Sequence, residues 1–363
     1  MDARRHHPAV QEAADRAIMR LRSLSKVDQG ISIELLRPFL LALSISSNNR
    51  RSSPKLISLS LSGLQRLLAA QIVDVSQLVN VTRVLLIQAD TNKEEIKIKI
   101  LQTLPLVMTS KAFDVDQELI AQALRVCFAL HASSSPKTLV CHTTEATMRQ
   151  MISMLFDHVE EGSLGLTVMD EKSPSVRGAY LLFQDLCMLG SGGDTIWLRE
   201  GRLDRVLVLE LIESTISRHH SLFHTRPEFK RLLKLQLCPM IMNSFSKIAD
   251  FPSLVRMMRI CVAVLCKYGD VSLIASDLES LYSLMKKFIS REGIDGRVAL
   301  ESDPMILEWR RTLALETILQ WTTQPDLLQQ FCFAEGSDGI NSTSVSLFQS
   351  LNIWRHIYLI SCE

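Results

Sequence analysis

The stretch SPKLISLSLSGLQRLLA, residues 53–69, carries the pattern that decides the fold of this 363-residue chain. Its large apolar residues recur at intervals of three and four, which places them on one face of an α-helix. These residues are Ile57, Leu61, Leu64 and Leu68. Ser53 suits the N-cap and Pro54 the first helical position, so the sequence also predicts where this helix begins.

The same spacing recurs along most of the chain. The first seam consists of Val10, Ala14, Ala17, Leu21 and Leu24. Later seams run through residues 119–130, 148–159, 176–186, 254–268 and 274–288. The segment VLVLEL, residues 206–211, resembles a buried strand, but it lies inside an uninterrupted stretch from 202 to 218, so its length favours a helix. We expect about thirteen helices and no strand of alternating polarity.

Helix starts recur about every 20 to 25 residues, so a pair of helices takes about 40 to 47 residues, the period of HEAT and armadillo arrays. A single pair would leave its apolar face uncovered, and stacking on neighbouring pairs covers it. The sequence therefore predicts an all-α fold of armadillo/HEAT-like stacked helix pairs forming an elongated array.

The composition agrees with long helices. Hydrophobic residues make up 47% of the chain and aromatic residues only 6%, and the 14 glycines and 11 prolines are few for this length. Lys and Arg number 40 against 39 Asp and Glu. Such a balance gives no overall positive field, so we expect no nucleic-acid partner.

The eight cysteines include no C-x-x-C pair, and most lie within apolar helical patterns, where cysteine acts as a small hydrophobe. This usage predicts a reduced compartment without disulfides or a zinc ribbon. The N-terminal residues have no apolar core of a signal peptide, and the chain has no run of 18 apolar residues. We therefore expect a cytoplasmic protein whose membrane contact is peripheral and made through partners.

Two motifs suggest a cofactor or a metal, and neither is convincing. The segment GSGGDT, residues 190–195, has Asp194 where a phosphate loop needs Lys, and a helix instead of a strand precedes it. His220 and His224 are four residues apart, with His219 beside them and Cys238 further on, but no H-E-x-x-H arrangement is present. We interpret the first as an inter-helix loop and predict no cofactor and no metal site.

No catalytic group is indicated either. Cys141 and His142 are only neighbours in sequence, whereas a nucleophile and its base normally come from distant positions. Glu210 and Glu213, like the Glu94–Lys99 segment, are better explained as solvated helix faces or caps. Pro239 should kink or break a helix, which would shape the curvature of the array or, as an alternative, expose a groove for a partner. We expect that the chain is not an enzyme.

Several segments resemble the N-terminal part of the Mon-two family of trafficking scaffolds, which is related to the large Arf guanine-nucleotide exchange factors. The most specific segment is AYLLFQDLCML, residues 179–189. Others are collinear with the family in residues 7–25, 61–69, 143–159, 208–217, 228–246, 251–265 and 324–332. About nine-tenths of the chain is covered.

The resemblance implies three regions. Residues 1–165 would form a dimerisation and cyclophilin-binding-like (DCB) helical domain. Residues 175–340 would form a domain like the homology-upstream-of-Sec-seven (HUS) region. Residues 341–363 form a divergent tail that we expect to add little to the fold. Compared with the family, the chain begins inside the first helix and ends early, as a truncated or alternatively spliced product would.

The resemblance also implies a function. The Mon-two family lacks the catalytic Sec-seven domain, so the chain would be a non-catalytic scaffold in vesicle-mediated transport at the trans-Golgi network and endosomes. Its implied partners are an Arf-like small GTPase and a Dopey-family protein, with possible self-association. Two alternatives stay open: a regulator of an Arf guanine-nucleotide exchange factor acting in trans, and a nucleic-acid-binding helical repeat, which would need one continuous basic face.

Overall fold

The computed structural model describes residues 7–23, 33–45, 53–108, 116–164, 173–199, 203–245, 250–268, 277, 280–281 and 304–322. These residues form two compact units. Unit 1 comprises Met1–Asp185 with Asp194–Leu207, and unit 2 comprises Leu186–Gly193 with Val208–Glu363. The predicted tail, residues 341–363, lies outside the described residues, as does most of the 274–288 seam.

Unit 1 is built from helices. They are α2 (Pro8–Ser23), α3 (Ile33–Leu43), α4 (Pro54–Ala69), α5 (Val75–Ala89), α6 (Glu94–Val107), α8 (Gln117–Ala132), α9 (Leu139–Leu164) and most of α10 (Pro174–Gly190). The predicted start of α4 is confirmed, because Ser53 is its N-cap with an extended backbone and Pro54 follows at the start of the helix. The side chain of Ser53 makes no capping hydrogen bond.

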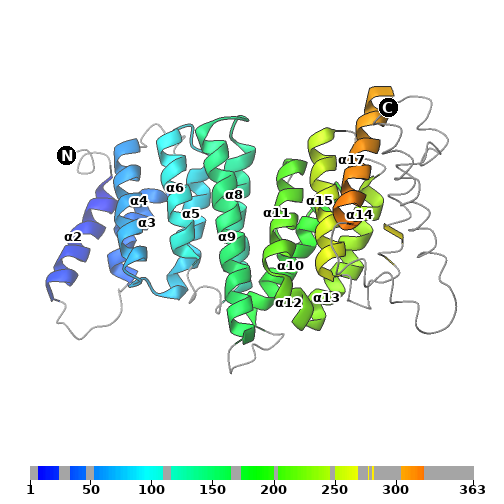
Figure 1. Cartoon of the computed structure of the whole chain (residues 1–363). Helices are drawn as coiled ribbons and strands as arrows, with labels where there is room; N and C mark the ends of the chain where they lie inside the picture. The colour runs from blue at the N-terminus through cyan, green and yellow to red at the C-terminus, as the bar shows by residue number, and fades with distance from the viewer. Residues whose placement is uncertain are drawn as a thin grey trace. The chain divides into compact units, whose positions relative to one another are not determined.

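The helices of unit 1 pack as pairs that stack on one another (Figure 1). The pairs are α3 with α4, α5 with α6, and α8 with α9. The first helix of each pair also contacts the first helix of the next, and the second contacts the second, so two layers form. This is the packing of a HEAT or armadillo array, and it confirms the predicted fold class.

The apolar seams predicted from spacing form the core. Ile57, Leu61, Leu64 and Leu68 are all buried in α4, and the seam residues of α8 and α9 are buried as well. The first seam is only partly correct, since Val10 and Ala17 are buried but Leu21 is 57% exposed. α2 is the first helix among the described residues and packs against α3, and it buries a narrower face than the helices inside the stack.

Side-chain hydrogen bonds fix the register between stacked helices. The buried side chain of Gln88 in α5 donates to the carbonyl oxygens of Leu43 and Ile45 at the end of α3, at 2.7 and 2.8 Å. Lys97 in α6 donates to the carbonyl and hydroxyl oxygens of Ser133, the C-cap of α8, at 3.2 and 2.9 Å. The carbonyls at a helix end have no partner within the helix, so these bonds satisfy them from the neighbouring pair.

Unit 2 is also helical over its described residues. It contains the end of α10, α11 (Arg205–Arg218) from Val208 on, α12 (His220–Thr225), α13 (Pro227–Leu232), η1 (Leu233–Leu237), α14 (Cys238–Phe245), α15 (Phe251–Tyr268) and α17 (Pro304–Thr322). The segment VLVLEL is helical within α11, as its length predicted. Neither unit contains a strand among the residues that the structure describes.

Pro239 neither breaks nor ends its helix. α13, the π-helical segment η1 and α14 follow one another without interruption from Pro227 to Phe245, and Pro239 is the second residue of α14. A proline cannot supply the usual amide hydrogen and its ring crowds the carbonyl four residues earlier. In the π-helical turn directly before Pro239, backbone hydrogen bonds span five residues instead of four. The helix therefore continues through the proline.

We predict that Leu85→Ala lowers the free energy of unfolding by about 2–5 kcal/mol, because Leu85 is fully buried in α5 between two neighbouring pairs. The matched control is Leu86→Ala, since Leu86 is the next residue of the same helix and is 39% exposed. Urea denaturation followed by circular dichroism measures both variants. Equal destabilisation by the two substitutions would contradict the assigned burial.

Candidate functional site

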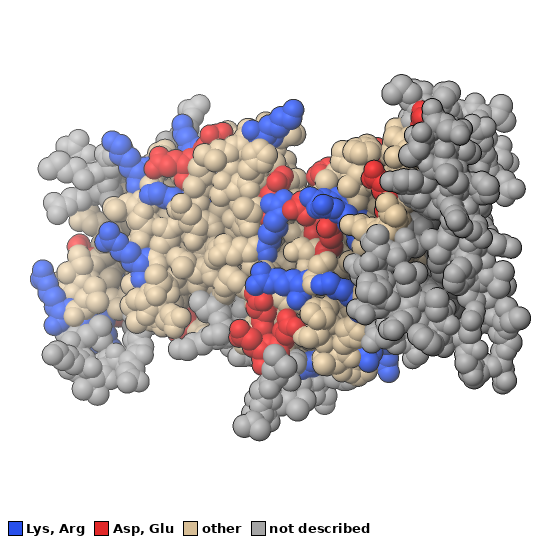
Figure 2. All heavy atoms as spheres, in the orientation of Figure 1, with Lys and Arg blue, Asp and Glu red and all other residues tan. Residues whose placement is uncertain are grey.

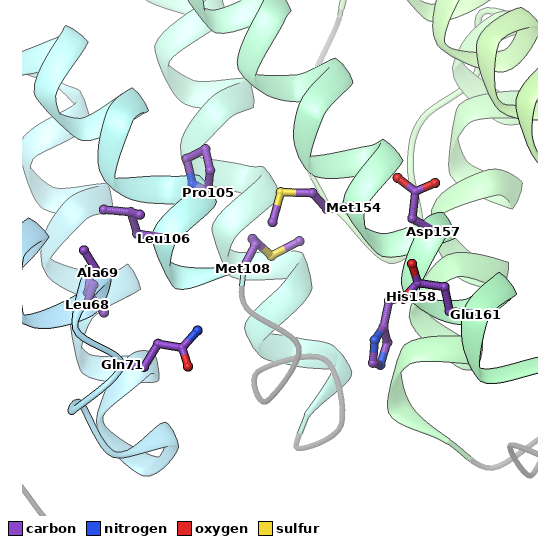
Figure 3. Close-up of a pocket in the computed structure, with 10 residues that line it drawn as sticks. All are labelled: Leu68, Ala69, Gln71, Pro105, Leu106, Met108, Met154, Asp157, His158 and Glu161. Atoms are coloured by element: carbon purple, nitrogen blue, oxygen red, sulfur yellow. The ribbon is translucent and has the colours of Figure 1, made fainter. Parts of the chain in front are cut away.

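A groove of about 360 Å³ lies in unit 1 where α4, α6 and α9 come together near one end (Figure 3). Its apolar lining is given by Leu68, Ala69, Pro105, Leu106, Met108 and Met154. Asp157, His158 and Glu161 of α9 line the other side, and Figure 3 shows Met108 and Met154 between these polar residues and the end of α4.

The end of α4 contributes a strained residue to this groove. The amide of Ile72 donates to the carbonyl of Leu67 and the amide of Gln71 to that of Leu68, a Schellman ending of the helix. Gln71 occupies the left-handed position with φ of 53°, where glycine is preferred. Its side chain lines the groove, whereas a glycine would leave that position bare.

The groove can accept one or two apolar side chains of a partner. Its volume lies at the lower end of the range for small-molecule sites, and two methionines give it an adaptable apolar floor. The carboxylates of Asp157 and Glu161 lie at its rim, and the Asp157 carboxylate also accepts a hydrogen bond from Ser153 at 3.2 Å. A partner residue with a positive charge next to an apolar side chain therefore complements it.

Unit 2 has a second groove, of about 470 Å³, between α15 and α17. Val255, Met258 and Leu313 give it an apolar part, and Arg259 and Glu316 supply charges of opposite sign. This mixed lining gives less indication of the chemistry of a partner than the groove of unit 1 does.

The candidate phosphate loop is a helix ending. The amides of Gly192 and Gly193 donate to the carbonyls of Leu189 and Met188, both at 2.9 Å, and Gly192 has φ of 81°. These are the two bonds of a Schellman motif at the end of α10. The loop amides therefore complete the preceding helix, in agreement with the interpretation as an inter-helix loop.

The histidines near residue 220 have structural contacts. The His224 ring stacks on Tyr268 with centroids 5.1 Å apart, and its Nε2 lies 2.6 Å from the carbonyl oxygen of Lys267. The rings of His220 and His224 are 6.4 Å apart and edge-on. Within the described part of the chain, the residues grouped closely enough for a metal ion include none of these histidines and not Cys238.

The carboxylates of α11 do more than face solvent. Arg256 of α15 lies 3.3 Å from Glu210 and 2.9 Å from Glu213, and Arg259 lies 3.7 Å from Glu213. These ion pairs join two helices within unit 2.

Lys97 of α6, in unit 1, was also expected on a solvated helix face. It is buried instead, and its ammonium group lies at the end of α8.

The buried cysteines of the described residues are packing residues, as predicted. Cys127, Cys187 and Cys261 are buried in α8, α10 and α15, and burial raises the pKa of each thiol. Burial also raises the pKa of Cys238 to about 12. A thiol that stays protonated at neutral pH is a poor nucleophile.

Sequence reasoning missed a buried polar network of unit 1. The carboxylate of Asp185, which is 1% exposed, accepts hydrogen bonds from the backbone amides of Ile196, Trp197 and Leu198 at 3.0, 3.0 and 2.7 Å. The aspartate thereby holds the loop that follows α10. Its sequence context, FQDLC, indicates only a polar residue in a helix.

Arg125 of α8 holds the same loop from the other side. Its guanidinium donates to the carbonyl oxygens of Leu198 and Trp197 at 2.7 and 2.8 Å and pairs with Glu118 at 2.5 Å. Amides of the loop thus bind an anion, and carbonyls of the same residues bind a cation. Hydrogen bonds to charged groups are the strong ones in a folded chain.

Two family descriptions match the chain. The dimerisation and cyclophilin-binding domain of Mon2/Sec7/BIG1-like proteins matches residues 1–163, and the HUS domain of Mon2/Sec7/BIG1-like proteins matches residues 175–334. Arg125 lies in the first matched region, while Asp185 and the loop that it holds lie in the second. The two regions are therefore joined by this network inside unit 1.

Curated relatives agree with these matches. The chain is 26% identical to the Protein MON2 homolog of Homo sapiens over 92% of its length, and 27% identical to that of Drosophila melanogaster over 92%. It is 22% identical to Protein MON2 of Saccharomyces cerevisiae over 90% of its length. The match takes up 20 to 21% of each of these relatives, so the chain spans about a fifth of their length.

Among the described residues, no helix has the length and apolar character needed to cross a membrane.

We predict that Asp185→Ala lowers the free energy of unfolding by about 3 kcal/mol or more, because it leaves three backbone amides without their buried acceptor. Asp185→Asn retains the shape and one acceptor oxygen, so its effect should be smaller. Asp194→Ala, an exposed position in the same loop, is the control. Chemical denaturation gives the comparison, and an Asp185→Ala variant as stable as the control would show that the network contributes little.

Proposed function

The chain belongs to the Mon2/Sec7/BIG1-like family, and we propose that it serves as a non-catalytic scaffold in vesicle-mediated protein transport at Golgi and endosome membranes. The observation that carries the proposal is the pair of family matches, to the DCB and HUS domains, on a chain folded as stacked helix pairs. Stacked pairs present long surfaces at fixed spacing, which suits the binding of several partners at once.

The proposed partners are an Arf-like small GTPase and a Dopey-family protein. In this scheme the GTPase, anchored in the membrane by its own lipid, recruits the chain from the cytoplasm to the trans-Golgi network and endosomes. Near-zero net charge supports this order of events, because each Lys or Arg near an anionic membrane contributes only about 1 kcal/mol and similar numbers of acids offset it.

The surface charge disfavours the nucleic-acid alternative. On the face shown in Figure 2, basic side chains of the described residues are interspersed with acidic ones, and they form no continuous basic stripe there. Two of the arginines of α15 are paired with glutamates of α11. Binding to nucleic acid depends on an uninterrupted positive track along the phosphates.

The second candidate function is regulation of an Arf guanine-nucleotide exchange factor in trans. It is favoured by the family description itself, which groups the two matched domains with those of Sec7 and BIG1. In that case the array would bind an exchange factor and change its rate, whereas the scaffold would leave the rate unchanged.

We further propose that the chain self-associates through the groove of unit 1. The first matched domain is described as a dimerisation domain, which supports self-association in general. The occupant that we assign is α2 of a second copy. Ile18, Met19 and Leu21 of α2 are exposed, and Arg20 and Arg22 lie in its last turn. Apolar side chains next to arginines complement the methionine floor and the carboxylate rim of the groove.

The recruitment proposal is tested by flotation of the purified chain with liposomes of Golgi-like composition, with and without a lipidated Arf-like GTPase in its GTP form. We predict several-fold more chain in the floating fraction when the GTP-loaded protein is present, since protein contacts supply most of the affinity. The GDP-loaded protein is the matched control. Equal recovery in all samples contradicts partner-dependent recruitment and indicates direct lipid binding.

The self-association proposal is tested by light scattering coupled to gel filtration. We predict that the native chain is dimeric and that Met154→Glu or Met19→Asp makes it monomeric, because each places a charge in the apolar contact. Leu59→Asp is the control, since Leu59 is as exposed as Met19, at 70%, and does not line the groove.

A charge exchange makes the test specific for these two surfaces. Arg22→Glu should weaken the dimer, and adding Glu161→Arg should restore it by reversing both charges. A dimer that is unaffected by Met19→Asp and Met154→Glu would place the contact elsewhere. A monomeric native chain would contradict self-association itself.

A further inference from the structure

Three side chains with metal-binding atoms meet where α8 ends and α9 begins. His131 lies in the last turn of α8, and Cys141 and Glu145 lie one turn apart near the start of α9. A tight connection of six residues, 133–138, joins the two helices and brings the two ends together. In the sequence alone, Cys141 has only His142 as a neighbouring candidate group.

The three ligand atoms lie close to one another. The distance from Cys141 Sγ to Glu145 Oε1 is 3.7 Å, and that from His131 Nε2 to the same oxygen is 3.9 Å. All three atoms fall within 4.8 Å of each other. A tetrahedral zinc ion with bonds of about 2.0–2.3 Å separates its ligands by about 3.3–3.8 Å. Small side-chain shifts would therefore bring these atoms to a common ion.

The choice of side chains indicates the class of metal. One thiolate, one imidazole and one carboxylate form a set that zinc and similar borderline-soft divalent ions bind, whereas magnesium and calcium prefer oxygen atoms alone. Cys141 is buried and His131 and Glu145 are partly buried, so an ion here would have an open position facing solvent.

The Glu145 carboxylate is the common partner in this cluster, where it accepts a hydrogen bond from the Cys141 thiol. Glu145 also lies 3.8 Å from His142 Nδ1 and 3.7 Å from Arg149. A divalent ion would satisfy the sulfur and the carboxylate together and release the thiol proton to solvent.

We propose that His131, Cys141 and Glu145 bind one zinc(II) ion, with water as the fourth ligand, and that the ion fastens the end of α8 to the start of α9. His142 is not a ligand in this assignment, because its ring is 64% exposed and it is not among the side chains whose ligand atoms meet. The site is independent of the proposed trafficking role and of the groove of unit 1.

The test uses the purified, untagged chain freed of metal with a chelator and then titrated with zinc in competition with a chromophoric chelator. We expect one zinc ion per chain. Cys141→Ser and His131→Ala should each weaken zinc binding at least about tenfold, since each removes a direct ligand. Circular dichroism and the melting temperature of the metal-free variants establish that they fold like the native chain.

Two matched controls locate the site. His142→Ala removes the neighbouring histidine, and Cys266→Ser removes a partly exposed cysteine of α15. Both should leave zinc affinity within about twofold of that of the native chain, since neither is assigned as a ligand. A loss with His142→Ala as large as that with His131→Ala would overturn the assigned ligand set.

Cobalt(II) provides a second readout, because a bound thiolate gives a charge-transfer absorption in the near ultraviolet. This band should appear in the native chain and be lost in Cys141→Ser. The proposal is overturned by the absence of stoichiometric zinc binding, by binding that Cys141→Ser does not weaken, or by a cobalt complex without the thiolate band.

Discussion

The structure depends on one constraint, namely that a pair of helices cannot cover its own apolar face. In unit 1 each pair is covered by the next, so α5 packs against both α3 and α8. The same contact has to satisfy the backbone carbonyls at the helix ends, and Gln88 and Lys97 do this from neighbouring helices. Apolar burial therefore supplies most of the stabilisation, while a few polar side chains select one register among many.

The matched family regions and the compact units have different limits. The HUS match begins at residue 175, yet α10 as far as Asp185 and residues Asp194–Leu207 belong to unit 1. Arg125 and Asp185 bind opposite sides of the backbone of the loop that follows α10. The limit of a family match follows sequence similarity, whereas a structural unit ends where contacts become few. A surface of unit 1 can therefore contain residues from both matched regions.

Much of the fold could be predicted from the sequence, because the spacing of apolar residues reports burial directly. The seams of α4, α8 and α15 are correct at every position. Leu21 could not be assigned, because its exposure depends on how many neighbours α2 has. The roles of Asp185 and of the His131–Cys141–Glu145 cluster depend on where a loop returns in space, and single helical patterns contain no such information. The groove of unit 1 is likewise formed by residues from three helices and a turn.

The π-helical turn before Pro239 has a geometric consequence for the whole helix from Pro227 to Phe245. Among its buried residues, Phe229, Leu233, Leu237, Ile241 and Phe245 recur every four positions. In a regular helix of 3.6 residues per turn, each such step rotates the side chain about 40° away from the previous one, and four steps would carry it almost to the opposite face. The wider turn removes part of this angular drift. These five side chains thereby stay closer to one face of the helix than they would without the π-helical turn.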